Sequence, residues 1–391
     1  MKFHASADGT DDALYEIPVL DGFSFSQSTN STEVTLNEAA DSSGNSKRGR
    51  AMFNDSFAPA EWSFSTYMRP SVSDSSDTYT IASGEGSHAG NAKKFAVEGP
   101  LWAAMSATTY NLGVGGTGAP TLASFEPNVF NFQNSNKVAL GVFDLFFVLG
   151  ASKDTDGTYT SGSGGVMIYK IEGCSIGSAS IDFDIEGIAQ VAWSGNGKLI
   201  TEQATLNTAA GQASTKGLIN EGISSTTNFI RQKLTDLAIA YDASESTGDT
   251  TGIGSSDITY SLTLTGGNIT IENNLTYLTP ESLGTVNQPL GHVMGTRSVS
   301  GNFTCYLNDV SNGSADLFEN LVESTGLITN AFALTFGIGG SGNTPSVDVA
   351  IPKAHLELPS HSIDDVIGIE VNFHGLSSDL SSATASSSAN E

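Results

Sequence analysis

Strict alternation of apolar and polar residues defines the strands of this chain, and it recurs in both halves. In residues 298–307 the even positions hold Ser, Asn, Thr and Tyr, whereas the odd positions are apolar or small. Residues 181–193 and 363–373 show the same two-residue period near the end of each half. A period of two is typical of a β-strand with one buried face. The chain is therefore predicted to be mainly β.

Matching elements follow one another in the same order along the two halves. Each half has an opening strand segment, a further strand, a short apolar helix, an apolar strand and a closing strand. The matched residues are 14–38 with 258–282, 61–70 with 300–309, 99–107 with 314–324, 138–149 with 331–338, and 181–193 with 363–373. Chance agreement of this many ordered elements is improbable, so one β-rich module is predicted to occur twice.

The matches predict the domain organisation. Residues 1–197 form a first module and residues 228–378 a second. Residues 198–227, which are polar and rich in Ala, Thr and Gly, are predicted to be a linker that lets the modules lie side by side. The Ser-rich residues 379–391 are predicted to be disordered. The expected fold class is mainly β with one short helix per module (α+β), built as a duplicated β-sandwich or barrel.

The helices are predicted from apolar residues at helical spacing. The first helix would bury Leu101, Trp102 and Met105. The second would begin at Ser314 as its cap. Its apolar face would consist of Leu317, Phe318, Leu321 and Val322.

The charge balance argues against a protein that holds nucleic acid by its phosphates. The 391 residues include 42 acidic and 16 basic ones, for a net charge of -26, although only 15% of residues are charged. Phosphate binding requires clustered Lys and Arg, which so few basic residues cannot supply. Solubility alone also accounts for an acidic surface.

Cysteines and hydropathy indicate a soluble protein made in a cytoplasm. Cys174 and Cys305 are too few for a disulfide framework, and Cys305 shares the apolar parity of its strand. The first residues contain no apolar signal segment, and no apolar run approaches membrane-spanning length. No membrane association is expected.

Motifs that would carry catalysis or metal binding are incomplete. Residues 113–118 match G-x-G-x-x-G, but Pro120 follows where a helix should begin, which excludes a dinucleotide site. Residues 154–157 resemble a calcium loop, yet Gly165 stands where the bidentate Glu should be. No catalytic residue, metal or cofactor is predicted.

Histidines and serines add no such site. His355, His361 and His374 lack the spacing of a helical zinc pair, and no serine lies in a G-x-S-x-G elbow.

A long excursion interrupts the opening strands of the second half. Residues 277–297 separate two strands that an ordinary hairpin would connect through about 2–5 residues. An excursion of this length and apolar content is predicted to contact another molecule. The residues assigned to that contact are Leu278, Pro280, Leu283, Val286, Gln288, Leu290 and Met294.

Residues 276–307, TYLTPESLGTVNQPLGHVMGTRSVSGNFTCYL, resemble the long hairpin and following strand of phage tail tube proteins. The resemblance implies a structural subunit of the virion tail, assembled in the host cytoplasm, whose rings stack into a hollow tube. In that family six modules form each ring, and members with duplicated domains form it as a trimer. The resemblance thus implies homotrimeric rings, passage of double-stranded DNA without tight binding, and contacts with sheath, baseplate or tail-terminator proteins. The excursion would then join subunits or stacked rings.

Strand geometry agrees with a tube. If each of six modules contributes four strands, 24 strands about 4.8 Å apart and tilted near 40° close at a backbone diameter of roughly 48 Å. A bore of roughly 35–40 Å remains after side chains are subtracted, which admits a duplex about 20 Å wide.

Carboxylates are candidates for the channel wall. Asp182, Asp184 and Glu186 alternate with apolar residues, and Glu370 lies on the corresponding strand of the second half. Alternation puts such residues on one face of a strand. They are predicted to line an acidic lumen, although an ordinary solvated face would have the same pattern.

Two other classes of protein remain open. A surface-displayed β-rich adhesion or binding protein would also be acidic and rich in Ser, Thr and Gly, but it would require an export signal. A hydrolase with a dispersed active site would require a deep pocket with perturbed carboxylates.

Overall fold

The computed structural model describes residues 2–3, 13–34, 39–40, 42–47, 51–68, 70–72, 94–96, 98–106, 112–113, 121–122, 128–130, 140–150, 158–162, 165–207, 215–218, 229–241, 257–279, 286–323, 332–340, 346–363, 367–376 and 387–390. Mostly antiparallel β-structure dominates these residues, as the alternation predicts. None of the helices within these ranges is long and apolar enough to cross a lipid bilayer.

One continuous antiparallel sheet runs through both halves of the chain, and we call it the wall. Each strand of the wall pairs with the next in the series. Its strands, in spatial order, are β3 (Ser24–Ser26), β8 (Ala60–Tyr67), β17 (Gln190–Gly197), the second part of β16 (Met167–Asp184), β23 (Leu264–Glu272), β26 (Ser298–Tyr306), β30 (Ile367–Gly375) and β29 (Ser360–Ile363).

A second layer packs against one face of the wall in each half. In the first half it comprises β14 (Phe143–Leu149), β1 (Lys2–Phe3), β2 (Ala13–Glu16), β18 (Leu199–Glu202) and β20 (Thr215–Leu218). In the second half it comprises β21 (Asp236–Tyr241), β22 (Ile258–Ser261), β27 (Phe332–Ile338) and β28 (Val347–Leu356), with β31 (Ser387–Asn390) and β13 (Asn128–Phe130) beyond β28.

Long strands pass from one layer to the other. The first part of β16 pairs with β14 and β18, and its second part pairs with β17 and β23. Gly173, with φ 59°, and a register shift between Ile176 and Ser178 mark the bend. Glycine adopts such a positive φ without steric cost, which allows the strand to turn there. In the second half β28 pairs with β27 and then, at its end, with β30.

The two halves have the same order of strand pairing. In the first half the order is β3–β8–β17–β16–β14–β1, and in the second it is β23–β26–β30–β28–β27–β21. Ser24 lies opposite Ser63, as Asn268 lies opposite Asn302, which is the register that the sequence alignment of the halves predicts. This agreement supports the predicted duplication, which stays a prediction.

In each half, an aromatic ring covers a glycine on the neighbouring strand. The two halves differ in which strand of the pair provides the ring. In the first half Trp62 on β8 faces Gly195 on β17, and a Cβ on Gly195 would lie 2.5 Å from the indole. In the second half Phe373 on β30 faces Gly301 on β26, and a Cβ there would lie 2.7 Å from the phenyl ring. A real Cβ cannot approach so closely, so glycine is required beneath each ring.

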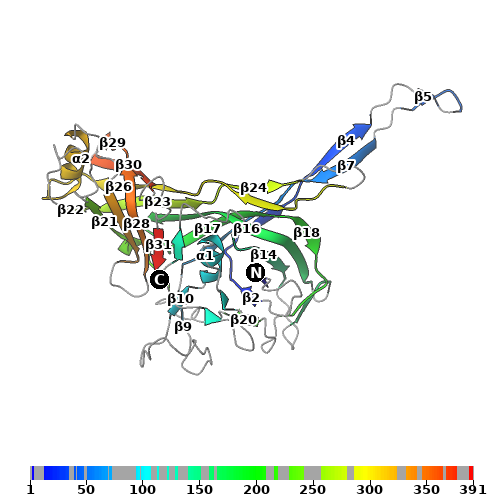
Figure 1. The fold of residues 1–391 in the computed structure, drawn as a ribbon, viewed down its shortest axis with the longest axis horizontal. Helices are drawn as coiled ribbons and strands as arrows, with labels where there is room; N and C mark the ends of the chain where they lie inside the picture. Colours follow the sequence, from blue (N-terminus) through cyan, green and yellow to red (C-terminus); the bar gives the residue numbers. More distant parts are fainter. Residues whose placement is uncertain are drawn as a thin grey trace.

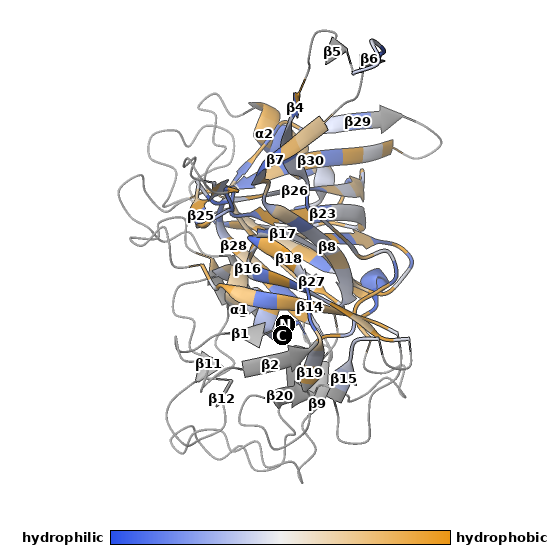
Figure 2. Ribbon diagram, turned by 90° about the vertical axis from the view of Figure 1, so that its right-hand side faces the viewer, coloured by the Kyte–Doolittle hydropathy of each residue, from blue (hydrophilic) through white to orange (hydrophobic). Residues whose placement is uncertain are grey.

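The core lies between the layers and is apolar and aromatic. In Figure 2 the wall strands are banded in orange and blue, as expected when one face is buried and the other polar. The largest fully buried side chains include Trp102, Trp193, Tyr241, Tyr260, Phe303 and Phe336. Trp193 also donates a hydrogen bond from Nε1 to Thr66 Oγ1 at 2.9 Å, which pairs a polar atom inside this core.

Helix α1 (Gly99–Ser106) buries Leu101, Trp102 and Met105, as predicted. Helix α2 (Ser314–Glu323) buries Leu317 and Leu321, but Val322 is 53% exposed, so the predicted apolar face is narrower than expected. Ser314 is the first helical residue and not the cap. Its N–H donates to Asn308 Oδ1 at 3.0 Å. A short 3-10 helix, η2 (Gln232–Leu234), precedes β21.

Parts of the predicted linker and tail are strands. β18, β19 (Thr205–Asn207) and β20 fall within residues 198–227, and β18 pairs with β16, so β-structure continues beyond residue 197. β31 falls within the predicted disordered tail and pairs with β28. Backbone hydrogen bonding does not depend on side-chain composition, so a Ser-rich segment can complete a sheet edge.

Small two-stranded sheets complete the fold. The longest, β4 (Thr29–Val34) with β7 (Ala51–Phe57), forms an arm that projects away from the body (Figure 1). The others pair β5 (Ala39–Ala40) with β6 (Ser46–Lys47), β9 (Pro70–Val72) with β10 (Lys94–Ala96), β11 (Leu112–Gly113) with β12 (Thr121–Leu122), β15 (Thr158–Thr160) with β19, and β24 (Leu275–Leu278) with β25 (Gly291–Met294).

Candidate functional site

The polar face of the wall is acidic. Its carboxylates come from both halves of the chain, and their residues are Glu61, Asp182, Asp184, Glu272 and Glu370. The wall strands, counting β16 from Ser175 onward, contain no Lys or Arg among their described residues. This face therefore presents an acidic surface without intervening Lys or Arg in the described wall strands.

Amide side chains orient two of the predicted carboxylates. Asp182 accepts a hydrogen bond from Asn268 Nδ2, which also donates to Ser180 Oγ at 2.8 Å. Glu370 Oε1 accepts from Asn302 Nδ2 at 3.0 Å. Both carboxylates lie on the polar face, three strands apart, which corresponds to about 14 Å at ordinary strand spacing.

The other two predicted carboxylates lie at the end of β16. Asp184 is the last residue of this strand, and its Oδ1 accepts the Ile185 N–H at 2.6 Å. Glu186 lies in the following turn, not on the strand, and Ile185 is 46% exposed where the alternation predicted a core residue. The alternation over residues 181–193 predicted one strand, but the structure divides it into the end of β16, a turn and the start of β17. Glu186 was therefore placed on the strand face wrongly.

Exposed polar residues continue the same face towards the last strands. Asn372 Nδ2 donates to Glu357 Oε2 at 2.9 Å, and His374 Nε2 lies 3.2 Å from Glu357 Oε1. The hydrogen bond from Asn372 and the contact with His374 lower the pKa of Glu357. Glu357 is therefore a stable anion at neutral pH.

The long excursion forms the β24–β25 hairpin, and the predicted contact residues divide into three groups. Met294 is 3% exposed and packs with Leu140 and Leu275 of its own chain. Pro280 and Leu283 lie outside the described residues. The remaining four are exposed at the surface, and they are Leu278, Val286, Gln288 and Leu290.

This hairpin docks on the first half of its own chain. Tyr277 Oη lies 2.9 Å from the carbonyl oxygens of both Gly173 and Asn196. His292 Nδ1 lies 3.0 Å from Ser175 Oγ. Burial raises the pKa of the Tyr277 hydroxyl, and burial followed by the charge of Lys198 lowers the pKa of His292. The hairpin is thus held by buried polar groups as well as by Met294.

Arg297 locks the base of the hairpin to helix α1. Its Nε donates to Asn273 Oδ1 at 2.7 Å, and NH2 donates to the Met105 carbonyl at 2.9 Å. Its guanidinium also lies 5.6 Å from the ring of Phe130. A cation at the carboxyl end of a helix is favourable because the last carbonyls lack helical partners. Burial lowers the pKa of Arg297 to about 10, so it stays charged near neutrality.

The β4–β7 arm meets the hairpin only at its base within the described residues. The Phe57 N–H donates to the Asn287 carbonyl at 2.8 Å, and the Asn287 N–H donates to the Asp55 carbonyl at 3.1 Å. Further out, Met52 and Phe53 are 63% and 62% exposed. Because successive residues of a strand point to opposite faces, each face of this arm exposes one large apolar side chain.

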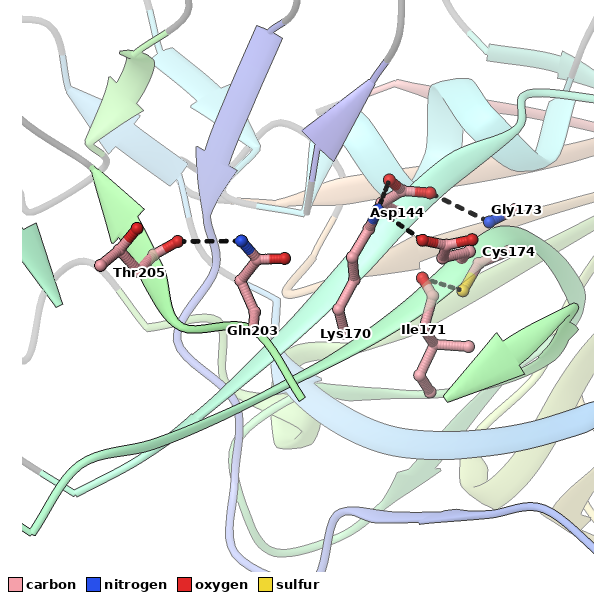
Figure 3. Close-up of polar contacts among 8 residues, drawn as sticks. Asp144, Lys170, Ile171, Gly173, Cys174, Gln203 and Thr205 are labelled. Carbon is pink, nitrogen blue, oxygen red and sulfur yellow. Dashed lines mark hydrogen bonds and ion pairs between the residues drawn. The ribbon is translucent and has the colours of Figure 1, made fainter. Parts of the chain in front are cut away.

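A polar cluster holds the bend of β16 (Figure 3). Lys170 Nζ lies 3.0 Å from Asp144 Oδ2 and 2.9 Å from Glu172 Oε1, and the Gly173 N–H donates to Asp144 Oδ1 at 3.0 Å. Burial acts to lower the pKa of Lys170, but its two carboxylate partners outweigh that effect and raise it. The buried Cys174 thiol, whose pKa burial raises well above its ordinary value, donates to the Ile171 carbonyl. These contacts fix backbone geometry.

Histidine and carboxylate side chains do not gather into a metal-ligand cluster in the described part of the chain. No group of three or more His, Cys, Asp or Glu there could hold a metal ion. His361 contacts Phe318, and the rings of His355 and His374 stack 6.3 Å apart. The calcium-like residues 154–157 lie outside the described residues.

Sequence reasoning missed the residues that dock the hairpin and the apolar pair on the arm. Arg297, Tyr277 and Asn273 have no motif, and their contacts join segments that are distant in sequence. Met52 and Phe53 had an available signal, because residues 29–57 occupy the position in the first half that residues 273–297 occupy in the second.

Comparisons with known proteins point to one family. The tail tube protein pb6 of Escherichia phage T5 is 32% identical over 372 residues, which cover 93% of this chain and 68% of that protein. No protein-family model matches the chain. A chain from the solved tail of an empty GTA particle, determined with C6 symmetry, aligns over 38% of this chain and 95% of its own length. That alignment has 14% sequence identity and a TM-score of 0.24.

Proposed function

Because the chain belongs to the phage tail tube proteins and is a structural component of the virion tail, we propose that three copies form a pseudo-sixfold ring. Rings stack into a hollow tube through which the double-stranded genome passes. The two halves occupy equivalent positions around the ring. Assembly takes place in the host cytoplasm, and further contacts are with sheath, baseplate or tail-terminator proteins.

The observation that carries this proposal is the wall. It contains four strands from each half, joined edge to edge where β16 meets β23. Within the described residues β3 and β29 are not paired with each other, so one chain forms an open sheet and not a closed barrel. Three walls of eight strands would give 24 strands, which close at a backbone diameter of roughly 48 Å.

The charge of the wall supports passage of DNA without tight binding. Duplex DNA carries about one negative charge per 1.7 Å, and Lys or Arg on a channel wall would bind it by releasing counterions. The polar face of the wall carries carboxylates instead, so the tube is proposed to turn this face towards the lumen. Repulsion from such a wall is screened within about 8 Å at physiological salt, which keeps the duplex centred and hydrated.

Electron microscopy of the purified protein tests the proposal. We expect rings or tubes with a central channel, and native mass spectrometry of single rings should give three chains. A protein that remains monomeric at high concentration, or rings that contain six chains, would contradict the trimeric arrangement. Binding to a carbohydrate array by a monomer would instead favour the adhesion alternative.

A further inference from the structure

We propose that β29 of one chain pairs antiparallel with β3 of the next chain in a ring, with Ser360 opposite Ser26 and Ser362 opposite Ser24. This inference rests on the proposed ring and adds to it the interface and its register. The partner is a second copy of the same chain.

The two strands are the open edges of the wall. Among the described pairings, β3 pairs only with β8, and β29 pairs only with β30. Ser24, Ser26, Ser360 and His361 are exposed. An open strand edge presents unpaired backbone N–H and C=O groups, which a second strand can satisfy.

The junction between β16 and β23 provides the template for the register. There, Ser180 lies opposite Thr270, Ile181 opposite Ile269, and Asp182 opposite Asn268. This junction joins the last wall strand of the first half to the first wall strand of the second half. A junction between chains would join the last wall strand of the second half to the first wall strand of the first half.

Strand pairing identifies the equivalent residues of β23 and β3. Asn268, Ile269 and Thr270 lie opposite Asn302, Gly301 and Ser300 of β26. In the first half, Ser24, Phe25 and Ser26 lie opposite Ser63, Trp62 and Glu61 of β8. Since Phe303 corresponds to Phe64, Thr270 corresponds to Ser26 and Asn268 to Ser24.

The same counting relates β16 to β29. Phe64 lies opposite Trp193, and Phe303 lies opposite Val371, so these two partners are equivalent. The residues just before these partners are Ala192 and Glu370. Ala192 pairs with Ser180 of β16, and Glu370 pairs with Ser360 of β29. Ser360 therefore corresponds to Ser180, and two residues on, Ser362 corresponds to Asp182. In the β16–β23 junction Ser180 lies opposite Thr270, so the same register between β29 and β3 places Ser360 opposite Ser26.

The faces of the two edges agree with this register. Phe25 points to the core side, where its ring stacks on Phe147 at 4.7 Å. His361, its proposed partner, also lies on the core side, because its ring contacts Phe318 of α2 at 4.3 Å. Ile269 and Ile181 hold the corresponding positions in the template, and both are buried. A slip of one residue would place His361 opposite a serine of the polar face.

Cysteine pairs test the register. S26C/S360C and S24C/S362C place thiols directly opposite, where Cβ atoms of paired strands lie about 4.5–5.5 Å apart. S28C/S362C is the matched control, because it keeps the β29 cysteine and moves its partner four residues out of register. The native Cys174 and Cys305 are 0% and 1% exposed and should not react.

We expect both in-register variants, assembled into tubes and treated with a short thiol cross-linker, to give covalent dimers and trimers on denaturing gels. The control should give monomers. A mixture of the S26C and S360C single variants should give dimers only, which shows that each link joins two chains. Circular dichroism of every variant verifies that it is folded.

Two results would be decisive against the inference. Tubes that form normally while S28C/S362C cross-links as well as the in-register pairs would overturn the register but leave the proposed function intact. Absence of rings and tubes from the unmodified protein would instead overturn the proposed function, and the interface with it.

Discussion

At the scale of single residues, Arg297 makes the most consequential contacts in the described chain. It joins Asn273, at the base of the hairpin, to the last carbonyls of α1. The substitution Arg297→Met keeps much of the volume but leaves those buried acceptors without their donor. Leaving a buried hydrogen-bond acceptor without its donor costs about 1–3 kcal/mol. Urea denaturation should show this decrease in the free energy of unfolding.

Arg231 offers the matched control, because its side chain is exposed. Arg231→Met removes the same charge from the chain, and surface substitutions usually change stability by less than about 0.5 kcal/mol. Equal destabilisation by the two substitutions would mean that net charge, and not the contacts of Arg297, is responsible.

At the scale of elements, acidification should loosen the β24–β25 hairpin. The pKa of His292 is lowered from its ordinary value of 6.5, chiefly by burial. The unfolded chain therefore binds a proton more readily than the native one as the pH falls through about 6.5. The stability associated with neutral His292 is complete above that pH and is lost below it, until the native imidazole also protonates.

The urea midpoint at about pH 7.5 and about pH 5.5 measures this loss. His292→Gln should reduce the difference between the two midpoints, whereas His361→Gln, which changes an exposed imidazole, should leave it unchanged. A pH difference that survives in His292→Gln would assign the effect to other groups.

The β4–β7 arm should be needed for assembly and not for folding. Met52 and Phe53 are more than half exposed, so Met52→Glu with Phe53→Glu should change the free energy of unfolding by less than about 0.5 kcal/mol. If the arm docks on a neighbouring chain as the β24–β25 hairpin docks on the first half, buried carboxylates there would prevent association. Sedimentation velocity should then show monomers. The matched control is Thr32→Glu with Asn30→Glu, which adds the same charge at exposed polar positions of the arm.

At the scale of the whole molecule, charge on the wall should govern how an assembled tube interacts with DNA. Intact tubes should not retain duplex DNA at moderate salt, because the polar face carries carboxylates and no Lys or Arg in its described strands. Asp182→Lys with Glu370→Lys should create retention that weakens steeply as salt rises.

Filter retention of labelled duplex by assembled tubes measures this effect. Glu33→Lys with Glu202→Lys, at two positions away from the wall strands, is the charge-matched control. Retention by the control equal to that by the wall variant would place the polar face of the wall outside the lumen.

Much of the wall could be predicted from local pattern. Alternation marked β26 and β30 because a strand with one buried face repeats apolar residues with a period of two. Over residues 181–193 it also marked the end of β16 and the start of β17, but it missed the turn between them. It failed at Glu186 and at Val322, where a turn and an exposed helix face depend on what lies beside them. Within the predicted linker, β18 is a strand because it pairs with β16, which its polar composition did not reveal.

Local sequence was enough to predict the β class, the order of elements in each half and the acidic charge. These properties reside in composition and in short-range periodicity, which need no knowledge of distant neighbours. Long-range contacts establish the rest: the halves share one wall, Arg297 and His292 are buried where the hairpin meets the first half, and β3 and β29 are open edges among the described pairings. Each of those facts depends on contacts between segments far apart in the chain, whose register no local pattern encodes.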